Sequence, residues 1–202
     1  MDNLDFRAVN EATQGIERVL QEFPKASKYL KVIGAKYLKA DAYMIAECRG
    51  AIAFNIPDYR DYYSVLDRLT LEAEEYYHPR NTKIYGAAAH EMGHILERAL
   101  IDIKGGGVQA WNGNFRAKDI IRAAIGTVRQ TPLGKNIITN ESGLKIASFK
   151  TVKQLRLEIS EYADAGGYGE CLAEAVCDYV TNGENASVLS KEIWSILKRE
   201  LG

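Results

Sequence analysis

The sequence is poor in cysteine, which excludes two common ways of holding a small protein together. Only three of its 202 residues are cysteine, namely Cys48, Cys171 and Cys177, and no two of them form a C-x-x-C pair. An odd number with this spacing predicts neither a disulfide framework nor a zinc knuckle built from thiolates. All three stand among apolar neighbours, so we interpret them as small buried side chains.

The chain also lacks a surplus of charge and a long apolar run. Its 26 basic and 27 acidic residues nearly cancel, which gives no electrostatic reason to expect nucleic acid or an anionic membrane as a partner. No apolar run approaches the roughly 20 residues of a spanning helix. The sequence begins Met-Asp-Asn-Leu-Asp, with two acidic residues and no basic one, whereas a signal peptide begins with basic residues followed by an apolar run. We therefore expect a cytoplasmic protein, although delivery to another cell or to a virion stays open, as does the oligomeric state.

The patterning predicts one domain over residues 1–202. A hydrophobic content of 47% suits a sizeable core, and the chain contains no repeat or linker. Short apolar runs between residues 30 and 55 predict three strands, residues 108–115 show no periodicity, and residues 132–150 could hold a hairpin. Helical spacing occurs over residues 9–23, 59–77, 81–102, 117–128, 151–162, 170–180 and 187–201. The predicted class is α+β, mostly helical with a small N-terminal sheet.

Histidine is scarce too, yet two of the three histidines form one motif, His90-Glu91-Met92-Gly93-His94. On a helix the two imidazoles lie one turn apart and can share a metal ion, with Glu91 beside them. This is the H-E-x-x-H pattern of zinc hydrolases, in which zinc lowers the pKa of a bound water to about 7 beside a carboxylate that can take its proton. The alternative interpretation is a core helix with two hydrogen-bonded histidines and an exposed Glu91.

The surroundings of the motif add two expectations. Asn81 or Thr82 could cap the helix, and three glycines from Gly105 onward should end it. His78 precedes His90 by twelve residues across a Pro79 turn, so we expect a loop residue and no metal ligand.

A catalytic zinc needs a third protein ligand, and a later helix offers carboxylates for it. No histidine follows His94, and Glu97 is interpreted as a solvated or supporting carboxylate. In an otherwise apolar helix, Glu170, Glu174 and Asp178 share one edge at intervals of four. Burying them is costly unless they are paired or bind a metal, so Glu170 could bind zinc while Glu174 accepts a hydrogen bond from a ligand imidazole. Alternatively, this acidic edge faces solvent or basic side chains.

The order H-E-x-x-H followed by Glu170-Cys-Leu-Ala-Glu174 resembles the gluzincin metallopeptidases of the anthrax lethal factor type, which include similar domains in bacterial toxins and phage-borne proteins. Other segments are similar as well, so the resemblance covers about residues 10 to 200. They are Phe23-Pro24 at the end of the first helix, Gly50-Ala-Ile-Ala-Phe-Asn, His78-Pro79, Ile159-Ser-Glu-Tyr-Ala and Leu189-Ser-Lys-Glu-Ile in the last helix.

The resemblance implies a zincin-like fold whose single zinc ion lies between the two helices. It implies zinc ligands at His90, His94 and Glu170, Glu91 as the general base, and Glu174 behind the ligands. It also implies a tyrosine that stabilises the transition state. Tyr162 fits that role by motif, but it precedes Glu170 by eight residues where the family has seven, and Tyr168 is a rival.

The hypothesis at this point is zinc-dependent hydrolysis of a protein or peptide substrate. The peptide would lie antiparallel along the strand Ala51 to Asn55, taken as the edge of the sheet. Three alternatives stay open: hydrolysis of a non-peptide amide, a phage morphogenesis component that retains zinc for stability, and a toxin passed to a neighbouring cell.

Overall fold

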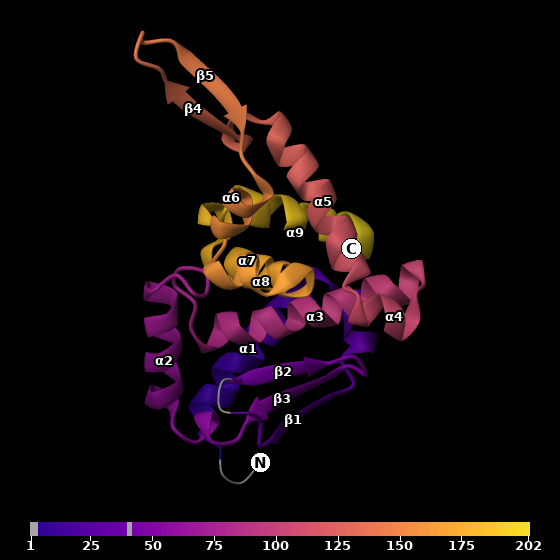
Figure 1. Cartoon of the computed structure of the whole chain (residues 1–202). Helices are drawn as coiled ribbons and strands as arrows, with labels where there is room; N and C mark the ends of the chain where they lie inside the picture. The colour runs from indigo at the N-terminus through magenta and orange to yellow at the C-terminus, as the bar shows by residue number, and fades with distance from the viewer. Residues whose placement is uncertain (1–3, 40–41) are drawn as a thin grey trace.

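The computed structural model describes residues 4–39 and 42–202 and has the predicted α+β class, mostly helical with a small N-terminal sheet (Figure 1). Within the described residues, no helix has both the length and the apolar character needed to cross a membrane. The strands are β1 Val32–Lys36, β2 Met44–Glu47, β3 Ala51–Asn55, β4 Lys135–Thr139 and β5 Lys145–Phe149. The helices are α1 Phe6–Glu22, α2 Tyr62–Glu74, α3 Ile84–Lys104, α4 Gly107–Asn112, α5 Phe115–Gln130, α6 Val152–Leu157, α7 Glu161–Ala165, α8 Gly167–Asn182 and α9 Val188–Leu201.

Helix α3 carries the H-E-x-x-H motif and runs through the middle of the molecule, with α8 on one side and the N-terminal sheet on the other (Figure 1). Glycines let its neighbours come close. A Cβ on Gly15 of α1 would lie 2.1 Å from the Tyr85 carbonyl oxygen, and a Cβ on Gly93 would lie 2.6 Å from the Ala173 Cα of α8. The two helices therefore touch α3 backbone against backbone at these positions, and α8 is brought within reach of the motif.

The order of the N-terminal sheet is β1-β3-β2, which corrects one prediction. Strand β3, Ala51–Asn55, was expected at the edge, but it is the central strand, parallel to β1 and antiparallel to β2. Four of its five residues are buried, as expected for a strand covered on both faces. Its backbone groups are already used on both sides, so the strand with a free edge beside α3 is β2 (Figure 1).

Several element boundaries also differ from the predictions. Helix α3 begins after Lys83 without a side-chain cap, because the Thr82 hydroxyl donates to the Pro79 carbonyl instead of capping. Gly105 ends α3 as expected, but residues 107–112 form a short helix that the sequence pattern did not show. The helix predicted over residues 151–162 is two helices, because the buried Ser160 leaves the helical conformation and caps α7 through the Ala163 amide.

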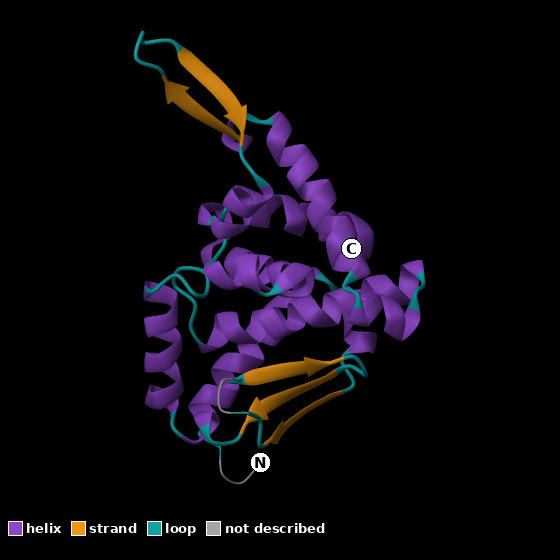
Figure 2. Ribbon diagram, in the orientation of Figure 1, coloured by secondary structure: helices purple, strands orange, loops and turns teal. Residues whose placement is uncertain are grey.

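Strands β4 and β5 form the predicted hairpin, which extends away from the helices as an arm (Figure 2). Every residue of β5 is exposed, and so are all but one in β4. The arm begins and ends at one place, where the Lys150 amide donates to the Gly134 carbonyl over 2.9 Å. The core therefore lies in the rest of the chain, around α3 and α8.

Replacing Gly93 with Ala tests the close contact between α3 and α8. The new methyl group meets α8 backbone, which cannot turn aside as a side chain would, so we expect the free energy of unfolding to fall by about 1–3 kcal/mol. The matched control is Gly126→Ala in exposed α5, where nothing lies within 4 Å of the new Cβ; it should raise stability by about 0.5–1 kcal/mol. Urea unfolding of both variants measures this, and equal stabilities would contradict the contact.

Candidate metal centre

Three ligand atoms from two helices meet beside α3. His90 and His94 project from one face of that helix, and Glu170 reaches them from the first turn of α8. The Glu170 Oε2 atom lies 3.1 Å from His90 Nε2 and 3.5 Å from His94 Nε2. All three ligand atoms lie within 4.8 Å of one another, so this group could hold one metal ion. Two imidazole nitrogens and one carboxylate oxygen are a donor set that fits zinc with an open position.

The position of Glu170 depends on the break between α7 and α8. Gly167 has φ +90, a left-handed conformation that glycine adopts without strain, and it lets the chain turn into α8. A Cβ on Gly166 would lie 2.6 Å from both Cβ and Cγ of Glu170, so only glycine leaves room for this side chain as it stands. The two glycines between Tyr162 and α8 thus direct the carboxylate to the histidines.

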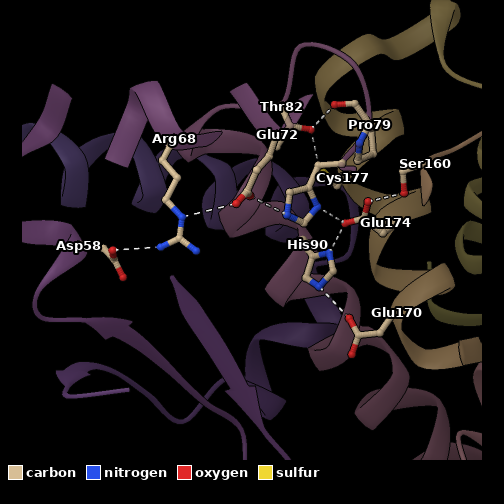
Figure 3. A network of polar contacts seen from close by, with 11 residues as sticks. Asp58, Arg68, Glu72, Pro79, Thr82, His90, Ser160, Glu170, Glu174 and Cys177 are labelled. Atoms are coloured by element: carbon tan, nitrogen blue, oxygen red, sulfur yellow. Dashed lines mark hydrogen bonds and ion pairs between the residues drawn. The ribbon is translucent and has the colours of Figure 1, made fainter. Parts of the chain in front are cut away.

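Glu174 is a fully buried carboxylate one turn deeper in α8, and three side chains satisfy it (Figure 3). His90 Nδ1 lies 2.7 Å from its Oε1 atom, His78 Nδ1 lies 3.0 Å from the same atom, and the Ser160 hydroxyl donates to Oε2 over 2.6 Å. With its Nδ1 atom engaged by Glu174, the His90 ring presents Nε2 to Glu170 and to a metal ion. The contact with Glu174 therefore fixes the orientation of the His90 ring. The sequence analysis expected Glu174 to accept such a hydrogen bond.

These contacts also set the pKa values of the groups in the metal-free protein. Burial lowers the pKa of His90, but its hydrogen bonds to Glu170 and Glu174 outweigh burial and raise that pKa well above its ordinary value. Burial raises the pKa of Glu174, yet the neighbouring His78 and His90 bring it down to about 2. The carboxylate is therefore ionised under all ordinary conditions and keeps its role as acceptor.

His78 has a role that the sequence did not reveal. It lies outside the three-residue ligand group, as expected, but it is not a free loop residue: it joins Glu174 to Glu72 of α2, with 3.5 Å between its Nε2 and Glu72 Oε2. Arg68 continues the chain of contacts from Glu72 to Asp58 (Figure 3). The signal available in the sequence was Glu174 itself, since a buried carboxylate requires more than one donor.

The remaining carboxylates near the centre serve the packing of helices. Asp178, on the same edge of α8, accepts hydrogen bonds from the Ser187 amide and the Asn182 side chain, not from cations. Glu97 is buried, not solvated, and accepts a hydrogen bond from the Ala117 amide in the first turn of α5. Burial raises the pKa of Glu97 to about 7.

The metal centre opens into a cavity of about 440 Å³. Glu91 lines it beside the ligands, and the wall opposite α3 is the start of β2. Histidine and carboxylate side chains line the cavity together with aromatic and small apolar residues. The lining residues are Ala42, Tyr43, Met44, Ile45, Ala46, Leu69, Glu72, Tyr77, His78, Thr82, Ala87, His90, Glu91, His94, Glu97, Trp111, Asn114, Tyr162, Glu170, Glu174 and Cys177.

The two tyrosine candidates lie in different surroundings. Tyr162 lines the cavity, and its ring is nearly parallel to the His90 ring, with 6.1 Å between the centroids. Burial, followed by the charge of Glu170, raises its pKa, so the hydroxyl stays protonated. Tyr168 instead lies beneath the cations of Lys118 and Arg156 and, among the described residues, is not part of the cavity wall. Of these two tyrosines, Tyr162 is the one that lines the cavity.

Comparisons of the chain with protein-family models, curated proteins and solved structures gave no match. The resemblance to gluzincins therefore rests on the motif residues, and the chemistry of the centre has to be argued from its geometry.

Replacing Glu174 with Gln tests whether this buried carboxylate orients His90. The amide keeps the shape but loses the charge that accepts from three donors, so we expect zinc affinity to fall by about 10- to 100-fold. Competition with a chromophoric chelator measures the affinity. Glu161→Gln, at an exposed position in α7, is the matched control and should bind zinc as the wild type does. Unchanged affinity in Glu174→Gln would remove the proposed role.

The raised pKa of Glu97 predicts a pH-dependent stability in the metal-free protein. Its folded pKa of about 7 exceeds the ordinary 4.5, so its contribution is fully present below pH 4.5 and is lost as pH rises through 7. We therefore expect Glu97→Gln to gain stability relative to wild type between pH 5 and pH 8, by at most about 3 kcal/mol. Urea unfolding with a chelator present measures the difference, with exposed Glu17→Gln as control. Parallel pH profiles would contradict it.

Proposed function

We propose that this chain is a zinc-dependent metallopeptidase, a hydrolase of the gluzincin type. The observation that carries the proposal is the convergence of His90, His94 and Glu170, with His90 anchored by a buried carboxylate and the whole group open to a cavity. A purely structural zinc site closes with a fourth protein ligand, whereas the described residues supply three and leave one side open. Zinc held there would act as a Lewis acid and would lower the pKa of a bound water.

Two side chains of the cavity have roles in this reaction. Glu91 follows the first ligand directly and faces the same space, so it is the group that would take a proton from the attacking water and pass it to the leaving amine. The Tyr162 hydroxyl, across the His90 ring, would donate a hydrogen bond to the carbonyl oxygen as negative charge develops on it.

Strand β2 offers the surface on which an extended peptide would lie. The Tyr43 carbonyl accepts from the Asn55 amide over 2.8 Å. Because bonded and non-bonded pairs alternate along an antiparallel ladder, Met44 and Ala46 turn their main-chain groups away from β3. Both residues line the cavity. A substrate strand added antiparallel to this edge would pass over the metal centre, which supports a peptide as the substrate.

Replacing Glu91 with Gln tests the proposal, since it removes the base and leaves all three ligands. Wild type and Glu91→Gln should each bind about one zinc ion per chain by elemental analysis, while His90→Ala and Glu170→Ala should bind much less. We expect turnover of a peptide library by Glu91→Gln to fall by about 10²–10⁴. Glu17→Gln, an exposed position on α1, should cleave as the wild type does.

Two results would contradict the proposal. A wild-type protein that contains zinc and leaves every peptide of the library intact is not a peptidase. A Glu91→Gln variant that cleaves at the wild-type rate rejects the role of Glu91. Neither result depends on stability, because the zinc content reports whether the centre is assembled.

A further inference from the structure

A second cavity, of about 510 Å³, lies beyond the metal centre along the same wall of the molecule. Trp111 of α4 lines both cavities and lies against the second ligand ring, with 6.3 Å between the centroids of Trp111 and His94. On the opposite wall, β2 lines the first cavity, and the turn that follows it, Cys48 and Arg49, lines the second. The two cavities are therefore successive parts of one groove along β2.

The second cavity differs from the first in charge. Lys31, Arg49 and Arg98 line it, and no carboxylate does among the described residues. None of the three cations forms an ion pair with a described acidic side chain. Two carboxylates nearby have partners other than these cations: Glu47 pairs with Lys36, and Asp102 accepts from the hydroxyl of Tyr29, a residue of the cavity wall. The groove thus passes from a centre rich in carboxylates to a pocket of unpaired positive charge.

The cations come from three separate segments, and each has a structural reason to face the groove. Arg98 follows His94 by four residues, so it lies on the same face of α3, about 6 Å further along the axis. Arg49 stands in the tight turn between β2 and β3, which Gly50 closes with φ +87. The Lys31 amide donates to the Gly50 carbonyl over 2.7 Å, which holds Lys31 beside that turn.

We propose that this pocket binds an acidic side chain of the peptide substrate, and so makes the enzyme selective for peptides with Asp or Glu at one position. The inference rests on the proposed peptidase function and names the substrate class of that site. The two cavities share Trp111, three cations without an acidic partner among the described residues line the second one, and a carboxylate is the charge on an extended peptide that they would attract.

The position of this acidic residue follows from the walls of the groove. Arg98 lies about 6 Å beyond His94, and Arg49 lies in the turn that begins directly after Glu47, the last residue of β2. An extended peptide advances about 3.3 Å per residue, so the pocket lies about two or three residues from the bond over the metal. A peptide antiparallel to β2 has its amino-terminal part at this end, so the acidic residue precedes the scissile bond.

Matched peptides that differ at this one position test the inference. Zinc-loaded wild type should cleave the Glu peptide with a kcat/KM about tenfold above that of the Lys peptide, with the Gln peptide between them, as expected for two or three partly exposed ion pairs. The preference should shrink in 0.5 M salt. In the double variant Lys31→Glu with Arg49→Glu the order should reverse. Arg122→Glu with Lys153→Glu, the same charge change at exposed positions of α5 and α6, is the control and should keep the wild-type order.

A binding measurement separates selectivity from turnover. Zinc-loaded Glu91→Gln should bind the labelled Glu peptide more tightly than the Lys peptide in fluorescence anisotropy, by a similar factor. Cleavage without preference at this position, or the same order in the double variant, would overturn the inference and leave the peptidase intact. If no peptide is cleaved or bound although zinc is present, the proposed function fails and the inference fails with it.

Discussion

The architecture depends on one buried charge, the Glu174 carboxylate in the middle of an apolar helix. A carboxylate with no exposed surface is tolerated only when its oxygens accept hydrogen bonds from several donors. Here the donors come from three distant parts of the chain: His78 before α3, His90 within α3, and Ser160 before α7. Because the buried carboxylate needs all three donors, it holds these segments together, and this also fixes the position of His90, a candidate metal ligand.

The close packing of α3 against α8 determines where the Glu174 carboxylate lies. Helices α3 and α8 meet at Gly93, where backbone lies against backbone, and the ligand on α8 is thereby brought to the rings on α3. A larger spacing between the helices would leave Glu174 too far from His90 and Glu170 too far from His94. Along α8, the residues that pack against α3 alternate with those that form the site. The interface between α3 and α8 therefore determines both the stability of the fold and the geometry of the centre.

Local patterns in the sequence were enough to predict the helices that carry the candidate site. They were not enough to predict the strand order or the contacts of outer residues such as His78. The spacing of His90 and His94 shows their shared face, and an apolar helix with Glu170 and Glu174 on one edge indicates a cation nearby. The order β1-β3-β2 depends on contacts between segments, so β3 was wrongly placed at the edge. Its apolar run, Ala51-Ile-Ala-Phe, was a usable signal, since a strand buried on both faces lacks alternation.

The arm formed by β4 and β5 leaves the body at Gly134 and returns to it at Lys150, whose amide donates to the Gly134 carbonyl. Because its side chains contribute almost nothing to the core, its length and composition are uncoupled from the spacing of α3 and α8. Insertions or deletions in the arm should therefore leave the distances between His90, His94 and Glu170 unchanged.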